Sequence, residues 1–482
     1  MNPIWLAAAA SAFALANGDE VKYQMHGKGW LDYGRIMHAE DTIVNALSPD
    51  DILNYDGNTL QSIGAQVTVV ADLSEHLEGG FGFGYYKASH ALGSGQFQYL
   101  TISLFQNFIT QSRLTWYSGE KAAPNLSLTV GGFNYNYNPD VKNLGLYLLR
   151  GPVYPGILMG GFQDFSADTT KANLLGLKLH HSMGMFSQDL ILNNERDIPP
   201  TFDWSLAYMA KLDLGAVQIG AGINLYRLIP YNSMLESPGD DTSLVNGSAR
   251  RRFLDIDNSN PAAPDTTVLT MQGQKVVGQF SLSLQKLFGM ELPGNPDDLK
   301  IYGEAGIIGV QSYGKIYGKI GERIPIMVGV NMPTFGFLDH LSIEVEHYGA
   351  KYRNDLAGTG YVYDEVAPWT VKAHPIATPK PLTNADYGID TAGVFKKSTD
   401  TAGVSVRGTA MDKENLTKDD LKWSLFAEKV VSGHIQFIGQ VANDHYRPRP
   451  VASGLIKSWG GTAEAFASPK DWYYMFRIGY FF

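Results

Sequence analysis

The last stretch of the chain, residues 472–482, alternates strictly between two kinds of side chain. The positions Trp472, Tyr474, Phe476, Ile478, Tyr480 and Phe482 are all apolar or aromatic. The intervening positions include an arginine, Arg477, and a glycine. Because successive side chains of a strand point to opposite faces, one face is wholly apolar and the other accepts a charge. This pattern favours a strand between lipid and water, although a strand of a soluble sandwich could also show it.

The same alternation recurs along the chain. In residues 62–69, for example, Ile63, Ala65, Val67 and Val69 alternate with Ser62, Gly64, Gln66 and Thr68. We therefore predict an all-β fold, a transmembrane antiparallel β-barrel of about 16 strands, with 14 to 18 possible. The strands are expected near 22–36, 58–72, 77–89, 97–108, 125–137, 172–181, 185–193, 203–212, 215–226, 272–287, 298–310, 323–331, 339–352, 421–431, 434–446 and 471–482. The link 109–124 is overlong for a turn and could extend the strand before it.

The connections between these strands fall into two classes. Short links such as Asp213-Leu214 and Ser432-Gly433 look like tight turns. Long polar links lie between them, the longest near 227–271 and 353–420. Barrels have short turns on the periplasmic side and long loops outside, so we expect both termini in the periplasm and these two loops outside the cell. Consistent up-and-down parity requires 138–171 to be one such loop.

The first residues are typical of a secretory signal peptide. Residues 4–16 form an apolar run that is much shorter than the roughly 20 residues a membrane helix needs. Ala14-Leu15-Ala16 matches the small-x-small cleavage pattern, although no Lys or Arg precedes the run. We expect residues 1–16 to be the signal peptide and residues 17–482 to form a single barrel domain.

The aromatic end of the chain resembles the terminal strand of bacterial outer-membrane β-barrels. Phe482, Tyr480 and Ile478 stand where that family has its final aromatic and apolar residues. The resemblance implies a bacterial outer-membrane location, contact with outer-membrane lipid, and recognition of these three residues by the barrel assembly machinery. The strand number resembles that of 16-stranded porins, which implies a possible homotrimer.

The loop 138–171 is unusually apolar for an exposed connection. Residues such as Leu144, Leu146, Leu148 and Val153 would be costly in water as a cluster. One interpretation is that the loop folds into the barrel and narrows it, as the loop after the fifth strand does in 16-stranded porins. The other is that 144–149 or 156–162 is an additional strand. The Pro-Glu-Phe-Gly-Gly signature of porin constriction loops is absent, and only Gly160-Gly161-Phe162 is similar to it.

Charged residues on the polar strand faces and in this loop are candidate pore-lining groups. Charges that face one another across a narrow pore determine which ions pass, whereas those in wide, solvated parts do little. The net charge of −10 weakly favours cations. The candidates are Lys28, Asp32, Asp140, Lys142, Arg150, Glu344, Glu346, Lys422 and Arg477.

Several other classes of protein find little support in the sequence. The negative net charge argues against nucleic-acid binding, and the absence of cysteine excludes thiolate chemistry. We find no Gly-x-Ser-x-Gly motif and expect no enzyme, metal or cofactor; lumen polarity explains Glu344 and Glu346 more simply than paired catalytic carboxylates do. The favoured function is a porin-like channel for passive diffusion of small hydrophilic solutes. One alternative is a surface-exposed adhesin or binding protein that uses the barrel as an anchor. Another is an outer-membrane hydrolase.

Overall fold

The structure is a computed structural model of the 482-residue chain. It describes residues 21–39, 42–45, 48–54, 56–57, 59–90, 104–144, 172–194, 203–229, 252–257, 265–270, 273–307, 310, 320–348, 421–444, 466 and 468–482. The predicted signal peptide, residues 1–16, and the loop 353–420 lie outside the described residues.

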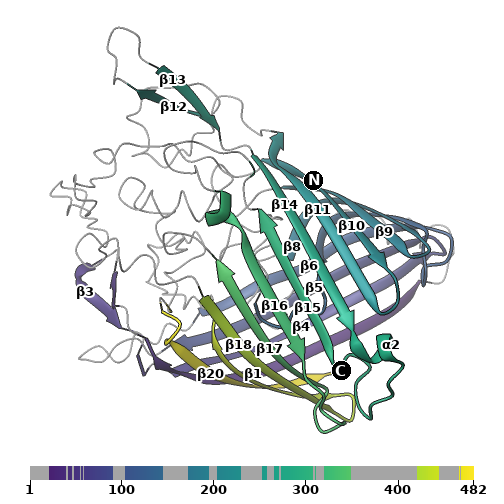
Figure 1. The fold of residues 1–482 in the computed structure, drawn as a ribbon. Coiled ribbons are helices and arrows are strands. Elements are labelled where there is room, and N and C mark those ends of the chain that lie inside the picture. The colour runs from purple at the N-terminus through teal and green to yellow at the C-terminus, as the bar shows by residue number, and fades with distance from the viewer. Residues whose placement is uncertain are drawn as a thin grey trace.

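Sixteen antiparallel strands form a closed barrel, which Figure 1 shows as one continuous tilted wall. Around the ring the order is β1-β20-β19-β18-β17-β16-β15-β14-β11-β10-β9-β8-β7-β6-β5-β4. The strands are β1 (Lys22–His38), β4 (Thr59–Ser74), β5 (Leu77–His90), β6 (Leu104–Ser118), β7 (Leu126–Tyr135), β8 (Ala172–Met183), β9 (Phe186–Asn194), β10 (Trp204–Asp213), β11 (Val217–Ile229), β14 (Gly273–Ser283), β15 (Lys300–Ile307), β16 (Pro325–Asn331), β17 (His340–Tyr348), β18 (Leu421–Val431), β19 (Ile435–Asn443) and β20 (Trp472–Phe481). The predicted fold and its number of strands are therefore confirmed.

The two faces of the wall differ as the alternation predicts. On β17, Ile343 and Val345 are 45% and 43% exposed on the outer face, while Glu344 between them is 0% exposed on the inner face. The apolar side chains of β20, Phe476 and Ile478 among them, are also exposed on the outside. An apolar outer band around a polar interior is the arrangement of a barrel surrounded by lipid.

The first and last strands close the barrel. Asp32 on β1 lies opposite Arg477 on β20 in the strand register. At the end of the chain, the backbone N–H of Gly27 donates to the carbonyl of Phe482 at 2.8 Å, and the N–H of Phe482 donates back at 3.0 Å. A side chain at Gly27 would collide with the Phe482 ring, so glycine is needed at this close approach.

The two ends of the barrel have different connections. At one end the strands are joined mainly by tight turns, such as Gly184 between β8 and β9 and Ser432-Gly433 between β18 and β19, whose φ angles are 59°, 54° and 72°. We call this the short-turn end; the chain also ends here. The opposite, long-loop end includes the connections from β7 to β8 and from β17 to β18.

Two strand predictions need correction. The strand expected at 97–108 is β6 (Leu104–Ser118), so residues 109–118 extend the strand and are not part of a link. The strand expected at 272–287 ends at Ser283, and Leu284–Phe288 forms a short helix, α2, at the short-turn end. The Ser283 side chain accepts a hydrogen bond from the N–H of Lys286 and caps this helix.

Smaller elements lie outside the barrel ring. Two hairpins join β2 (Thr42–Asn45) to β3 (Ser48–Asn54) and β12 (Arg252–Asp257) to β13 (Asp265–Thr270). The second hairpin lies within the predicted loop 227–271, whose residues show no hydrophobic period. A short 3-10 helix, η4 (Ile320–Arg323), precedes β16. No helix among the described residues is long and apolar enough to span a membrane.

Candidate functional site

A segment that follows β7, residues 136–144, crosses the interior of the barrel. Its hydrogen bonds reach Ala210 on β10 and Glu344 on β17. In the ring of sixteen strands, β17 is the eighth strand from β7 in either direction, so it lies on the opposite wall. We call residues 136–144 the crossing segment. The rest of the predicted loop 138–171, residues 145–171, lies outside the described residues.

Glu344 binds the far end of the crossing segment. One carboxylate oxygen, Oε1, accepts a hydrogen bond from the backbone N–H of Lys142 at 2.6 Å. The other, Oε2, accepts from the N–H groups of Asn143 and Leu144 at 2.8 and 2.6 Å. Three successive backbone N–H groups thus surround one buried carboxylate, as in the backbone nests that bind anions.

The Tyr302 hydroxyl completes the coordination of this carboxylate. It donates to Glu344 Oε1 at 2.8 Å. Its ring lies over Gly329 on β16, where an added Cβ would come within 2.3 Å of the ring. A small residue at 329 therefore allows the tyrosine of β15 to reach across β16 to β17. Four hydrogen bonds reduce the cost of burying a negative charge here.

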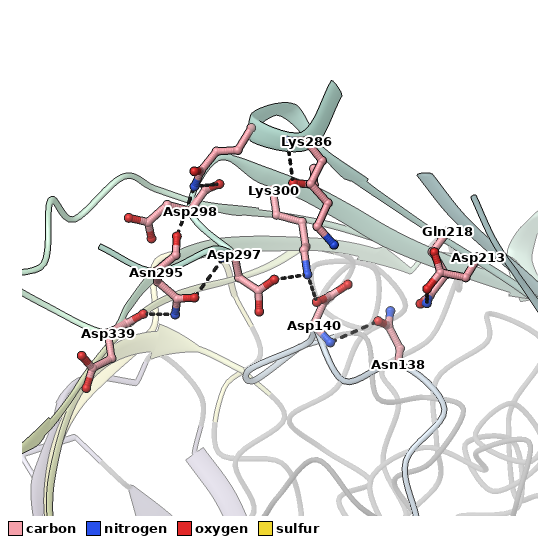
Figure 2. Close-up of polar contacts among 12 residues, drawn as sticks. Asn138, Asp140, Asp213, Gln218, Lys286, Asn295, Asp297, Asp298, Lys300 and Asp339 are labelled. Atoms are coloured by element: carbon pink, nitrogen blue, oxygen red, sulfur yellow. Dashed lines mark hydrogen bonds and ion pairs between the residues drawn. The ribbon is translucent and has the colours of Figure 1, made fainter. Parts of the chain in front are cut away.

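Side-chain contacts tether the crossing segment to two further regions. The side-chain amide of Asn143 donates to Ser424 Oγ at 3.0 Å and to Asp444 Oδ2 at 2.7 Å. Nearer the short-turn end, Lys300 Nζ lies 2.9 Å from Asp140 Oδ1 and 2.5 Å from Asp297 Oδ1. Figure 2 shows Lys300 reaching from the wall to both carboxylates. One lysine therefore joins the crossing segment to the linker between α2 and β15.

Asp297 on this linker has a shifted pKa. Burial alone raises the pKa of its carboxyl group, but the hydrogen bond and the positive charge of Lys300 outweigh that effect. The net result is a pKa below the ordinary value for aspartate. The carboxylate is thus the favoured form, which preserves the contact with Lys300.

Packing also fixes the crossing segment. The side chains of Val141 and Leu144 are fully buried. The hydroxyl of Tyr137 donates to the carbonyl of Ala210 at 3.2 Å. The same hydroxyl lies against Gly220 on β11, where an added Cβ would approach it to 2.4 Å. The predicted cost of exposing this apolar stretch is therefore avoided, at least for its first residues, by burial inside the barrel.

The candidates on β1 and β20 form two separate contacts. The Arg477 guanidinium pairs with Asp32 through both carboxylate oxygens, Nε to Oδ1 at 2.6 Å and Nη2 to Oδ2 at 2.8 Å. Ser62 Oγ donates to the same carboxylate at 2.6 Å. Lys28 Nζ lies 4.9 Å from the ring centroid of Phe481. Lys28 and Arg477 lie on neighbouring strands of the wall, because β1 pairs with β20.

The other residues predicted to line the pore lie at several places in the fold. Glu346 is buried on the inner face of β17. Lys422 on β18 is also buried, and its Nζ donates to the carbonyl of Phe466 at 2.9 Å. Lys142 contributes its backbone N–H to Glu344. Arg150 lies outside the described residues. The three residues of the predicted assembly signal, Ile478, Tyr480 and Phe482, all lie exposed on the outer face.

Some interior residues were not singled out from the sequence as site residues. Tyr137, within the crossing segment, contacts β10, and Lys300 contacts Asp140 of the segment. Tyr302 contacts Glu344, which binds the segment. These partners lie far apart in the sequence, so no local motif indicates the contacts. Lys178 likewise faces the interior, over the rings of Phe133 and Tyr135. Among the described residues, no group of three or more His, Asp or Glu side chains could hold a metal ion.

Comparisons with known proteins show no family for this chain. No family model matches the chain, and no curated protein matches it. Among solved structures, a mutant of the Rh. blastica porin is similar at 7% identity and a TM-score of 0.39. A triple mutant of the Rhodopseudomonas blastica porin gives 7% and 0.40, and each match covers 96% of this chain and 100% of the other. The closed ring of sixteen antiparallel strands itself gives this chain a porin-like fold.

Proposed function

We propose that this protein is a channel of the bacterial outer membrane through which small hydrophilic solutes diffuse passively. The observation that carries the proposal is the crossing segment, which leaves β7 and is held on the opposite wall by Glu344. A segment held across the inside of a barrel narrows the cross-section available to a solute. Selectivity then depends on the groups beside the constriction.

The chemistry of the inner face supports a wet interior. Its buried positions include many hydroxyl and amide side chains, such as Ser112, Thr129, Asn224, Gln279 and Gln440. A dry hydrophobic core would not contain so many polar side chains, because burying a polar group away from water costs free energy. The outer band of exposed apolar side chains supports a lipid environment.

We infer the orientation from the connections. In barrels of this kind the tight turns face the periplasm and the long loops face outward, so we place the short-turn end and the C-terminus in the periplasm. The interpretation of residues 1–16 as a signal peptide belongs to the same proposal, as does recognition of Ile478, Tyr480 and Phe482 during assembly. A trimer would agree with the porin-like fold and is also proposed on that ground.

Planar-bilayer recording of the purified protein tests the channel function. We expect stepwise current increases in potassium chloride as single barrels insert. A folded barrel that inserts but never gives steps would contradict the proposal.

The constriction can be tested separately because the chain contains no cysteine. Asn143 and Ser424 lie in hydrogen-bond contact, so the paired changes Asn143→Cys and Ser424→Cys place two thiols close together. A short bifunctional thiol reagent should join them while the step conductance changes little, since the segment already lies there. The matched pair Asn143→Cys and Glu75→Cys, with Glu75 exposed at the short-turn end, should not be joined. Efficient joining of that control pair, or none for the first, would show that the segment lies elsewhere.

A further inference from the structure

Two lysines on the inner wall lie over aromatic rings next to the crossing segment. On β8, Lys178 Nζ is 5.9 Å from the ring centroids of both Phe133 and Tyr135. On β10, Lys211 Nζ is 5.3 Å from the ring centroid of Tyr137. The three rings alternate along β7 and its continuation, so they line one side of the interior. Such cation–ring contacts hold an ammonium group in place without neutralising its charge.

Neither lysine forms an ion pair with a carboxylate among the residues that the structure describes. Within the part of the chain that the structure describes, no Asp or Glu oxygen lies within 4.0 Å of Lys178 or Lys211 Nζ. The neighbouring inner-wall cations differ: Arg113 pairs with Glu78 at 2.7 Å, and Lys300 pairs with two aspartates. These two ammonium groups therefore stand out as charges that a ligand could bind.

A carboxylate on the strand between the two lysines already has two hydrogen-bond partners. Asp189 on β9 lies between the two lysine-bearing strands in the ring. Its Oδ1 is 2.8 Å from His180 Nδ1, and its Oδ2 accepts from the Tyr135 hydroxyl at 2.8 Å. This one carboxylate lies between two ammonium groups, so it pairs with neither lysine alone.

We propose that this wall, formed by Lys178, Lys211 and the rings of Phe133, Tyr135 and Tyr137, is a binding site for small organic carboxylates. The ammonium groups would donate charge-assisted hydrogen bonds to the carboxylate, and the ring edges would contact the apolar body of the solute. This inference rests on the proposed channel function and names a solute class for it. The site would retain organic anions inside a protein whose overall charge is negative.

Equilibrium dialysis of benzoate against the detergent-purified barrel tests the site without requiring conductance. We expect saturable binding of benzoate and much weaker binding of benzamide, which has the same shape without the charge. Lys178→Gln and Lys211→Gln should each weaken benzoate binding about tenfold or more, the effect of losing one charge-assisted hydrogen bond. Lys286→Gln, on the exposed face of α2, is the control and should bind as the native chain does.

The outcomes separate this inference from the channel proposal. Equal binding of benzoate and benzamide, or unchanged binding in both lysine variants, would overturn the site even if the barrel conducts. Binding that depends on the lysines in a barrel that never conducts would support the site and count against the channel. If both glutamine variants fail to fold, Lys178→Arg and Lys211→Arg retain the charge; loss of benzoate binding in the folded arginine variants would also overturn the proposal.

Discussion

At the scale of single residues, Glu344 holds the far end of the crossing segment through three hydrogen bonds. Its carboxylate accepts hydrogen bonds from three backbone N–H groups and from Tyr302. Glu344→Gln removes the charge and turns a donor group toward at least one of those N–H groups. We expect the free energy of unfolding to fall by about 2–3 kcal/mol, the cost of leaving buried donors without an acceptor.

Urea-induced unfolding of the folded barrel in lipid vesicles measures this loss. Glu75→Gln, at an exposed position, is the control and should change the free energy of unfolding by no more than about 0.5 kcal/mol. Equal losses in the two variants would mean that the Glu344 contacts do not hold the segment.

The pair Asp32 and Arg477 gives a second prediction at this scale. Both side chains are buried, and their two parallel hydrogen bonds join the first strand to the last. A double-mutant cycle with Asp32→Asn and Arg477→Gln should give a coupling energy of about 1.5–3 kcal/mol. A coupling energy below about 0.5 kcal/mol would show that water screens the pair as it screens a surface ion pair.

At the scale of elements, the fit between the crossing segment and the wall depends on a glycine. Gly220→Ala would put a Cβ 2.4 Å from the Tyr137 hydroxyl. We expect a loss of about 1–3 kcal/mol in the free energy of unfolding from this overpacking, measured by the same urea titration. Gly278→Ala on the neighbouring strand β14 is a matched control, because its added Cβ would meet only one atom, at 3.8 Å. If Gly278→Ala proves as damaging as Gly220→Ala, the strand glycine itself matters and the contact with Tyr137 does not.

The linker between α2 and β15 supplies a prediction about pH. The pKa of Asp297 is lower in the folded protein than in the unfolded chain, because Lys300 stabilises the carboxylate. The ionised Asp297 carboxylate therefore makes its full contribution to the free energy of unfolding at a pH above the pKa of the unfolded chain, near 4. This contribution is lost as the pH falls through the lower pKa of Asp297 in the folded protein. Unfolding measured between pH 6 and pH 3 should show less loss of stability for Asp297→Asn than for the native chain. Parallel pH curves would contradict this assignment.

The helix α2 shows how local sequence can mislead. Leu282 and Leu284 continue the apolar alternation of β14, so the period predicts a longer strand. The structure instead ends the strand at Ser283, whose side chain caps the helix, and closes the helix with Gly289 at φ 61°. Serine and glycine are both typical helix-capping residues, so Ser283 and Gly289 are a local signal for this helix.

The observed bounds of β6 differ from the expected range 97–108 for a different reason. A register shift between Gly82 and Phe83 on β5 interrupts the pairing with β6. Such an irregularity moves side chains from one face to the other, which hides the period of two within residues 109–118.

At the scale of the whole molecule, the sixteen strands could be predicted because each strand carries its own alternation. The contacts of the crossing segment could not, since Leu144 and Glu344 are separated by 200 residues and no local pattern links them. Glu344 and Glu346 lie on the same face of β17, and the alternation alone does not indicate that Glu344 accepts hydrogen bonds from the crossing segment. The path of residues 136–144 inside the barrel brings their backbone N–H groups to Glu344.

The single-channel conductance of the native chain and of Glu344→Gln, recorded under the same salt and voltage, tests the central claim most directly. If the barrel is a water-filled pore that the crossing segment narrows, the native protein gives discrete steps and the variant gives larger ones. Native protein without steps, or a variant whose steps are equal to or smaller than the native ones, would contradict the account.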